Sequence, residues 1–326
     1  VLKEFEQKVI KPFWLILIDA SDQIASGVYK VRKQDDIWKI TNPYIQYPKD
    51  QRKIIDYIFQ RKVGGKKLCD VFLGIVKKYK KALLIVLYKQ YIRQNNLINM
   101  KQDYNINEVK CPPEFNTIFI TFFYEKFFSL KALWKMVAGI EYNRGIFHEN
   151  FYKENMEIKV CPYCDISLTV SKSSNYVEHF LPKAKYPFLS MNPFNLISSC
   201  DACNKGEEGK GESVKDDITT PYSLMIGENI DFQLKAGKIH ISNISGLTCI
   251  DNYLDLLQLR KRYGQEKAFN YLKTELEIQL EYFGQMDNLS EKQIEAFLSK
   301  KDRHSPFNIA LKSVISKYPN YKSSLT

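Results

Sequence analysis

Four cysteines in two Cys-x-x-Cys pairs place the strongest constraint on how this 326-residue chain folds. The first pair is Cys161 and Cys164, and the second is Cys200 and Cys203. Both sulfurs of such a turn can face one tetrahedral ion, so the two pairs together supply the ligands of a zinc site. Because four thiolates leave no open coordination position, we predict a structural zinc ion. Disulfide exchange by Cys161 and Cys164 is an alternative, which the matched second pair disfavours.

The remaining cysteines stand alone in the sequence, and a total of seven is an odd number. This usage indicates metal ligands in a reducing compartment rather than a disulfide framework. The longest apolar run, residues 82–88, is too short to span a bilayer, and the opening segment lacks the pattern of a signal peptide. We therefore expect a cytoplasmic protein without a membrane-spanning segment.

The charge balance points to a polyanionic partner. Lys and Arg number 48 against 37 Asp and Glu, which gives a net charge of +11. Such an excess favours binding to nucleic acid, although charge says nothing about fold. An apolar content of 44% with 26% charged residues favours a globular chain over an intrinsically disordered one.

Apolar spacing predicts helices on both sides of the cysteine-rich centre. The helical stretches are residues 51–62, 67–94, 117–140 and 253–283. Residues 117–121 allow a short strand as an alternative, and we expect the aromatic residues of 117–140 to lie in a core rather than to stack on bases.

Turn and capping signals predict three further elements. Alternation around Ala236-Gly237 predicts a β-hairpin over residues 230–242. Ser290 with Gln293 predicts a capping box, and Ser305-Pro306 predicts the start of a last helix. The fold class that follows is mainly α with a small α+β centre. We expect a helical N-terminal region over 1–150, a central domain over 151–262 that holds the zinc site and the hairpin, and a helical C-terminal region over 263–326.

The segment between the cysteine pairs contains the candidate chemistry. NYVEHFLPK, residues 175–183, predicts a strand that ends at Glu178-His179. NPFNLISSC, residues 192–200, predicts a turn into a second strand, and a helix can begin at Asp201. Polar residues at a strand end beside a metal site are difficult to explain by packing alone. The predicted unit is therefore ββα, with a cysteine pair at each end.

The order Cys-x-x-Cys, Glu-His-x-x-Pro-Lys, Asn-Pro-x-Asn-Leu and Cys-x-x-Cys-Asn resembles that of the HNH endonucleases, the ββα-metal nucleases. The resemblance covers residues 161 to about 210. A weaker similarity extends through residues 248–262 and resembles the HNH proteins of bacterial anti-phage systems, including Septu and retron-associated systems.

The resemblance implies a role for each motif residue. His179 matches the general base, and Glu178 matches the carboxylate that holds a catalytic divalent ion. Asn195 matches a structural residue that bridges the loop and orients the histidine, and Asn204 matches a second metal ligand. The chain departs from the family pattern by Asn at the middle position and by Glu where Asp is usual. The implied catalytic ion is Mg²⁺, with Mn²⁺ or Ni²⁺ as alternatives.

The chemistry of these residue types agrees with that assignment. A neutral imidazole can accept a proton from water at neutral pH. A hard cation prefers carboxylate and amide oxygens, and it offsets charge that develops on a phosphate. Nearby lysines are candidates for phosphate contacts, with solvated surface charges as the alternative reading; they are Lys183, Lys185, Lys205 and Lys210.

The resemblance thus implies a metal-dependent nuclease that acts on DNA in preference to RNA, as the effector of an anti-phage system. The resemblance implies a regulatory ATPase subunit as partner, and this chain contains no P-loop motif of its own. The alternative is a catalytically silent zinc module that binds nucleic acid or a partner protein. An inactive relative would be expected to lack His179 or Asn204, and both are present.

Overall fold

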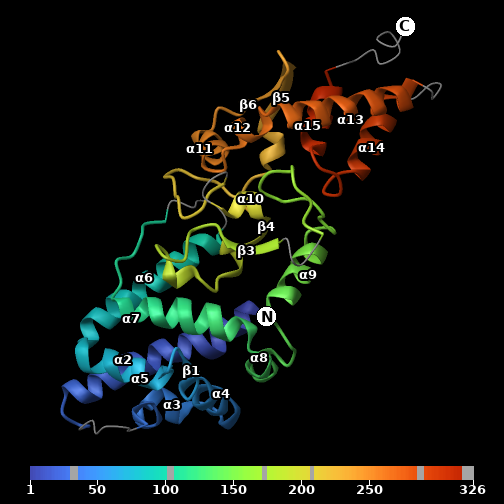
Figure 1. The fold of residues 1–326 in the computed structure, drawn as a ribbon. Helices are drawn as coiled ribbons and strands as arrows, with labels where there is room; N and C mark the ends of the chain where they lie inside the picture. Colours follow the sequence, from blue (N-terminus) through green and yellow to red (C-terminus); the bar gives the residue numbers. More distant parts are fainter. Residues whose placement is uncertain (30–35, 101–105, 171–174, 206–208, 285–289, 318–326) are drawn as a thin grey trace. The chain divides into compact units, whose positions relative to one another are not determined.

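The computed structural model describes residues 1–29, 36–100, 106–170, 175–205, 209–284 and 290–317 (Figure 1). These residues form two compact units, each built from segments that are discontinuous in sequence. The first unit contains Val1–Met100, Ile106–Phe147 and Leu181–Leu196. The second unit contains His148–Phe180 and the residues from Ile197 onward.

This division differs from the three consecutive regions predicted from sequence. Residues 181–196 belong to the first unit because the Phe188 ring packs among its aromatic rings, with ring centroids 5.6 Å from Trp14 and 5.0 Å from Phe119. The predicted boundary at residue 262 also falls inside a helix of the second unit. The two units are therefore defined by which segments share a buried apolar core, and these segments are not consecutive in the sequence.

The first unit is helical. Its long helices are α2 (Lys11–Ala25), α4 (Lys49–Phe59), α5 (Leu68–Lys78), α6 (Lys81–Asn99), the π-helix η3 (Thr117–Lys126) and α8 (Lys131–Ala138). Shorter elements are α1 (Leu2–Phe5), η1 (Glu6–Ile10), η2 (Ile37–Ile40), α3 (Asn42–Gln46), β1 (Lys62–Val63), β2 (Lys66–Lys67), α7 (Pro113–Asn116), η4 (Phe127–Ser129), η5 (Pro187–Leu189) and η6 (Pro193–Asn195). Helix α9 (Arg144–Glu154) begins in this unit and continues into the second.

One detail of the helical prediction is wrong, and one alternative is excluded. The stretch 67–94 is two helices rather than one, because Tyr79 and Lys80 adopt extended backbone between α5 and α6. A helix end leaves carbonyl groups without a partner in the helix, and the Tyr79 carbonyl accepts a hydrogen bond from Ser21 Oγ at 3.0 Å. Residues 117–121 form the start of η3 and not a strand.

The core of the first unit is aromatic. Trp14 is fully buried, and its ring lies 5.2 Å from that of Phe115 and 5.9 Å from that of Phe119. Phe122 and Phe123 of η3 are fully buried as well. The prediction that these aromatic residues form a core is confirmed.

The second unit contains short strands and a set of helices. Its elements are β3 (Asn175–His179), β4 (Leu196–Cys200), α10 (Asp201–Asn204), η7 (Ile226–Glu228), β5 (Ile230–Lys235), β6 (Lys238–Asn243), α11 (Thr248–Leu256), α12 (Leu259–Tyr263), α13 (Glu266–Gly284), α14 (Glu291–Lys300) and α15 (Asn308–Ile315). Strand β3 pairs with β4, α10 packs against β3, and α12 and α15 pack against the β5–β6 hairpin. The stretch 253–283, predicted as one helical region, is divided among α11, α12 and α13.

The hairpin and the capping box are confirmed. Strands β5 and β6 pair antiparallel from Ile230–Asn243 to Lys235–Lys238. Ala236 and Gly237 make the turn with φ of 52° and 72°, the left-handed values that a two-residue hairpin turn requires. The side chain of Ser290 caps α14 by accepting from the Gln293 amide. The start of the last helix differs, since α15 begins at Asn308 after Phe307, which has φ of 58°.

The prediction of a mainly α fold with small β elements is confirmed. Among the described residues, the strands form three separate two-stranded sheets, and helices make up most of the remaining regular structure. No helix within the described part of the chain combines the length and apolar character that crossing a bilayer demands.

Candidate metal centre and active site

The first cysteine pair lies in a tight turn of the second unit. The amides of Cys164 and Asp165 both donate to the Cys161 carbonyl, at 3.2 and 2.9 Å. Val160 and Leu168 form an antiparallel bridge on either side of this turn. We call residues 159–169 the cysteine turn. Its closure presents the sulfurs of Cys161 and Cys164 to the same side.

The second cysteine pair joins a strand to a helix. Cys200 is the last residue of β4 and Cys203 lies in α10. The four sulfurs lie within 4.8 Å of one another and the four residues are buried. Cys164 Sγ and Cys200 Sγ are 3.9 Å apart. Zinc–sulfur bonds of about 2.3 Å in a tetrahedron would place sulfurs about 3.8 Å apart, so the cluster has dimensions that could hold a zinc ion.

The electrostatics of the cluster favour a bound cation. Burial raises the pKa of the Cys161 and Cys203 thiols well above the usual range of a cysteine. Hydrogen bonds from the neighbouring thiols lower the pKa of Cys200, and against the effect of burial they also lower that of Cys164. Four buried thiols cannot all lose their protons unless a cation at the centre of the cluster neutralises the negative charge. A zinc ion at the centre would supply that charge and cross-link the cysteine turn to β4 and α10.

Residues of α11 and α12 surround the cysteine cluster. Arg262 is buried, and its Nη1 donates to Cys203 Sγ at 2.9 Å. Tyr253 OH donates to the Tyr163 carbonyl at 2.9 Å, and Tyr263 OH donates to the Cys164 carbonyl at 2.8 Å. None of these three side chains was predicted from the sequence to belong to the site. The one signal that could have found Tyr253 and Arg262 was the weaker family resemblance over residues 248–262, since a basic run such as the one around Arg262 is otherwise typical of a solvated helix face.

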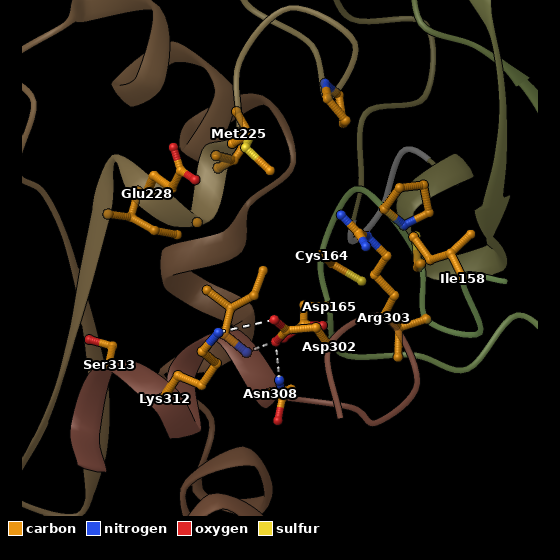
Figure 2. A pocket seen from close by; sticks show the side chains of 18 of the residues that line it. Ile158, Cys164, Asp165, Met225, Glu228, Asp302, Arg303, Asn308, Lys312 and Ser313 are labelled. Atoms are coloured by element: carbon orange, nitrogen blue, oxygen red, sulfur yellow. Dashed lines mark hydrogen bonds and ion pairs between the residues drawn. The ribbon is translucent and has the colours of Figure 1, made fainter. Parts of the chain in front are cut away.

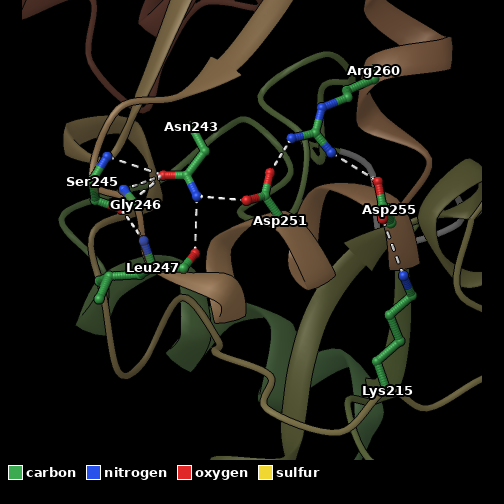
Figure 3. A network of polar contacts seen from close by, with 8 residues as sticks. All are labelled: Lys215, Asn243, Ser245, Gly246, Leu247, Asp251, Asp255 and Arg260. Atoms are coloured by element: carbon green, nitrogen blue, oxygen red, sulfur yellow. Dashed lines mark hydrogen bonds and ion pairs between the residues drawn. The ribbon is translucent and has the colours of Figure 1, made fainter.

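A polar network fixes the helices that carry these residues (Figure 3). Arg260 of α12 forms ion pairs with Asp251 and Asp255 of α11. Asp251 accepts from Asn243 Nδ2 at 2.8 Å, and Asp255 is bound by Lys215 Nζ at 3.1 Å. The end of β6 and the start of α12 are thereby tied to the same helix. This arrangement restricts the direction from which Arg262 reaches Cys203.

We expect Arg262→Met to weaken zinc binding by about ten- to a hundredfold, as loss of a residue that hydrogen-bonds a metal ligand commonly does. Arg262 donates to a sulfur that becomes more negative on deprotonation, so its loss disfavours the thiolate form. Zinc transfer to a chromogenic chelator measures the change. Lys261→Met, which removes the neighbouring and exposed lysine of α12, serves as control. Equal zinc affinity in the wild type and Arg262→Met would contradict this account.

Glu178 and His179 are the last two residues of β3. Glu178 is 8% exposed and His179 is 6% exposed, so both are largely buried. Glu178 Oε1 forms an ion pair with Lys210 Nζ at 2.8 Å. Asn204 ends α10, the helix that packs against β3 and carries Cys203. The second unit thus brings three of the four predicted catalytic residues onto two elements in contact.

Asn195 lies in the first unit and closes the loop 181–195. It is fully buried, its Oδ1 accepts from the Leu181 amide at 2.7 Å, and its Nδ2 donates to the carbonyls of Leu181 and Leu189 at 3.0 and 3.2 Å. The amide is therefore fully hydrogen-bonded within this loop. Such contacts suit a residue that holds the loop in one shape, and the orientation of the histidine by Asn195 remains a prediction.

The four candidate phosphate-binding lysines all form ion pairs. Lys183 pairs with Glu125 at 2.8 Å and Lys185 pairs with Glu108 at 3.4 Å, both within the first unit. Lys205 pairs with Asp201 at 2.6 Å in the second unit. The side chains of these three lysines are 34 to 63% exposed, whereas that of Lys210 is 0% exposed. Surface pairs of this kind contribute little to stability and open at little cost to bind a phosphate.

The second unit also contains a cavity of about 940 Å³ (Figure 2). The cysteine turn, residues 221–232 and the segments of α14 and α15 line it, and Glu178, His179 and Asn204 are not among its lining residues. Asp302 accepts from Lys312 Nζ at 3.0 Å and from Asn308 Nδ2 at 2.5 Å. The lining mixes carboxylates, basic groups and apolar side chains, so the cavity does not define one ligand chemistry.

Comparison with known proteins finds similarity over short stretches. A stretch of 61 residues is 44% identical to the Septu protein PtuB of Bacillus thuringiensis, and it covers 19% of this chain and 23% of that protein. A stretch of 74 residues is 39% identical to the protein ea31 of Escherichia phage lambda, covering 22% of this chain and 23% of that protein. The matched stretches span less than a quarter of each relative. No family model and no solved structure matches the chain.

Proposed function

We propose that this protein is an HNH-type endonuclease, which hydrolyses phosphodiester bonds of nucleic acid with a divalent metal ion, and that it acts in anti-phage defence. The observation that carries the proposal is the position of Glu178 and His179 at the end of β3, packed against the helix that bears Asn204 and Cys203. The motif order that resembles HNH endonucleases supports it. Partial similarity to a Septu protein supports the role in defence.

Each residue has a distinct task in this mechanism. The His179 imidazole takes the proton from the attacking water, and it is suited to this at neutral pH. Glu178 and Asn204 supply hard oxygen donors, which match the preferences of Mg²⁺, Mn²⁺ being the alternative. A divalent ion there would neutralise charge on the reacting phosphate. Asn195 keeps the loop after His179 in a fixed shape through its bonds to Leu181 and Leu189.

The substrate and partner follow from charge and resemblance. A net charge of +11 favours a polyanion, and we favour DNA over RNA. One carboxylate and one amide oxygen are few ligands for a divalent ion, so the substrate phosphate must complete the site. A regulatory ATPase subunit as partner would restrain cleavage in the host cell.

The test is cleavage of plasmid DNA and of total tRNA by the purified, zinc-loaded chain, with Mg²⁺ or with a chelator that removes Mg²⁺ but leaves zinc in place. We expect metal-dependent cleavage of DNA, which Asn204→Ala lowers by at least about a hundredfold, since a metal ligand contributes several kcal/mol to transition-state stabilisation. Asn204→Asp keeps an oxygen donor at the same position and should retain more activity. Exclusive cleavage of tRNA would replace DNA by RNA in the proposal.

A chain that cleaves nothing alone is then assayed with a candidate ATPase subunit. Cleavage only in the mixture would identify a nuclease under the control of its partner. Failure to cleave under both conditions, with nucleic-acid binding retained, would reject the enzyme and favour the silent zinc module.

A further inference from the structure

Lys210 differs from the other candidate lysines because its side chain is enclosed. The side chain is 0% exposed, and its Nζ lies 2.8 Å from Glu178 Oε1. The same nitrogen donates to the Gly211 carbonyl at 2.8 Å. A lysine in such a place cannot act as a mobile surface charge that closes on a phosphate. Its charge is directed at the carboxylate of Glu178.

The backbone around Lys210 is pinned to the metal-binding helix. The Lys210 amide donates to the Cys203 carbonyl at 3.0 Å, and the Gly209 amide donates to the Lys205 carbonyl at 2.8 Å. At Gly209 an added Cβ would lie 2.3 Å from the Ala202 carbonyl oxygen, so only glycine permits this approach. Because Cys203 is part of the cysteine cluster, the same local structure that supports zinc binding also fixes Lys210 beside Glu178.

The ion pair has an electrostatic consequence for metal binding. A buried carboxylate needs a positive partner, and Lys210 supplies one without any metal. The pair carries no net charge, so a divalent ion that approaches Glu178 meets a carboxylate already neutralised and a cation at short range. A bound phosphodiester brings negative charge close to Glu178 and Lys210, and this charge raises the affinity of the site for a divalent ion.

We propose that Lys210 is the internal counter-ion of Glu178, and that it keeps the affinity of this carboxylate for a divalent cation low until a phosphodiester is bound. The proposal rests on the proposed function, because it takes Glu178 as a ligand of the catalytic ion. Lys210 is thus a positioning residue that acts through Glu178. It couples metal binding to substrate binding.

The test measures Mn²⁺ binding in the absence of nucleic acid, by electron paramagnetic resonance of free Mn²⁺ in zinc-loaded protein. We expect Lys210→Met to bind Mn²⁺ at least about tenfold more tightly than the wild type, because the positive charge beside Glu178 that repels the ion is then removed. The double variant Lys210→Met with Glu178→Gln should lose this gain in Mn²⁺ affinity. Lys215→Met, which removes an ion-paired but more exposed lysine of the same unit, should leave Mn²⁺ affinity unchanged.

Mn²⁺ affinity that is equal or weaker in folded Lys210→Met would overturn the proposal and leave Lys210 a structural role only. If Lys210→Met does not fold, the deciding measurement is made on Lys210→Gln, which removes the positive charge but keeps a hydrogen-bond donor near Glu178. Its Mn²⁺ affinity without nucleic acid should also rise at least about tenfold. Equal affinity in folded Lys210→Gln and the wild type would also overturn the proposal. Both readouts are independent of cleavage, so failure of the nuclease assay is distinguishable from failure here.

Discussion

Substitution of serine for Cys200 is expected to remove zinc from the protein and to unfold the centre of the second unit. Cys200 is buried at the end of β4 and its sulfur lies 3.9 Å from that of Cys164. A serine hydroxyl is a poor zinc ligand, and the remaining three thiols would be left buried without a cation. Structural zinc ions contribute about 10–16 kcal/mol of apparent binding free energy in small zinc-dependent folds, so the loss is expected to be large.

Zinc content by mass spectrometry and amide hydrogen exchange measure this result. We expect about one zinc per wild-type chain and none in Cys200→Ser, with exchange faster in the cysteine turn, β4 and α10. Cys249→Ser is the matched control, since Cys249 is a half-buried cysteine of α11 outside the cluster. A Cys200→Ser protein that keeps its zinc and its slow exchange would rule out the four-cysteine site.

Substitution of alanine for His179 is expected to reduce phosphodiester cleavage by about 10²- to 10⁴-fold, the usual contribution of a general base. The reason is chemical, because alanine cannot take the proton of the attacking water. Initial rates on the preferred nucleic acid measure the loss at matched zinc content.

His240→Ala is the control for this experiment. His240 is an exposed residue of β6 in the same unit, and no part of the mechanism depends on it. We expect it to cleave at the wild-type rate. Equal cleavage by His179→Ala and the wild type would show that another group activates the water, and the mechanism proposed for His179 would be withdrawn.

Local signals in the sequence predicted local structure well. Cys-x-x-Cys spacing predicted the cysteine cluster, since each pair needs only one tight turn to bring its sulfurs together. Ala236-Gly237 predicted the hairpin because few residue pairs adopt two consecutive left-handed conformations. The strand that ends at His179 and a helix that begins at Asp201 were also predicted, whereas the end of that helix at Asn204 was not. The chemical roles of these residues remain predictions.

Features that depend on distant contacts were not predictable in this way. The partnership of Arg262 with Cys203 joins residues 59 positions apart, and no spacing rule connects them. Lys210 belongs to a short polar segment that is typical of a solvated loop, yet its contact with Glu178 buries it. The break between α5 and α6 is stabilised by Ser21, which lies 58 positions from Tyr79. In each case tertiary packing overrode the local pattern.

The interleaving of the two units has a consequence for synthesis on the ribosome. The first unit cannot be completed until residues 181–196 have emerged, because Phe188 fills its aromatic core. The cysteine turn waits longer, since Asp165 accepts hydrogen bonds from the amides of Phe307 and Ile309, the latter 144 positions away. Contacts of such sequence separation form late and slowly. The nascent chain therefore exposes its four clustered cysteines before Tyr253, Arg262 and Phe307 are translated, so a zinc ion could be captured before the helices that enclose the cluster exist.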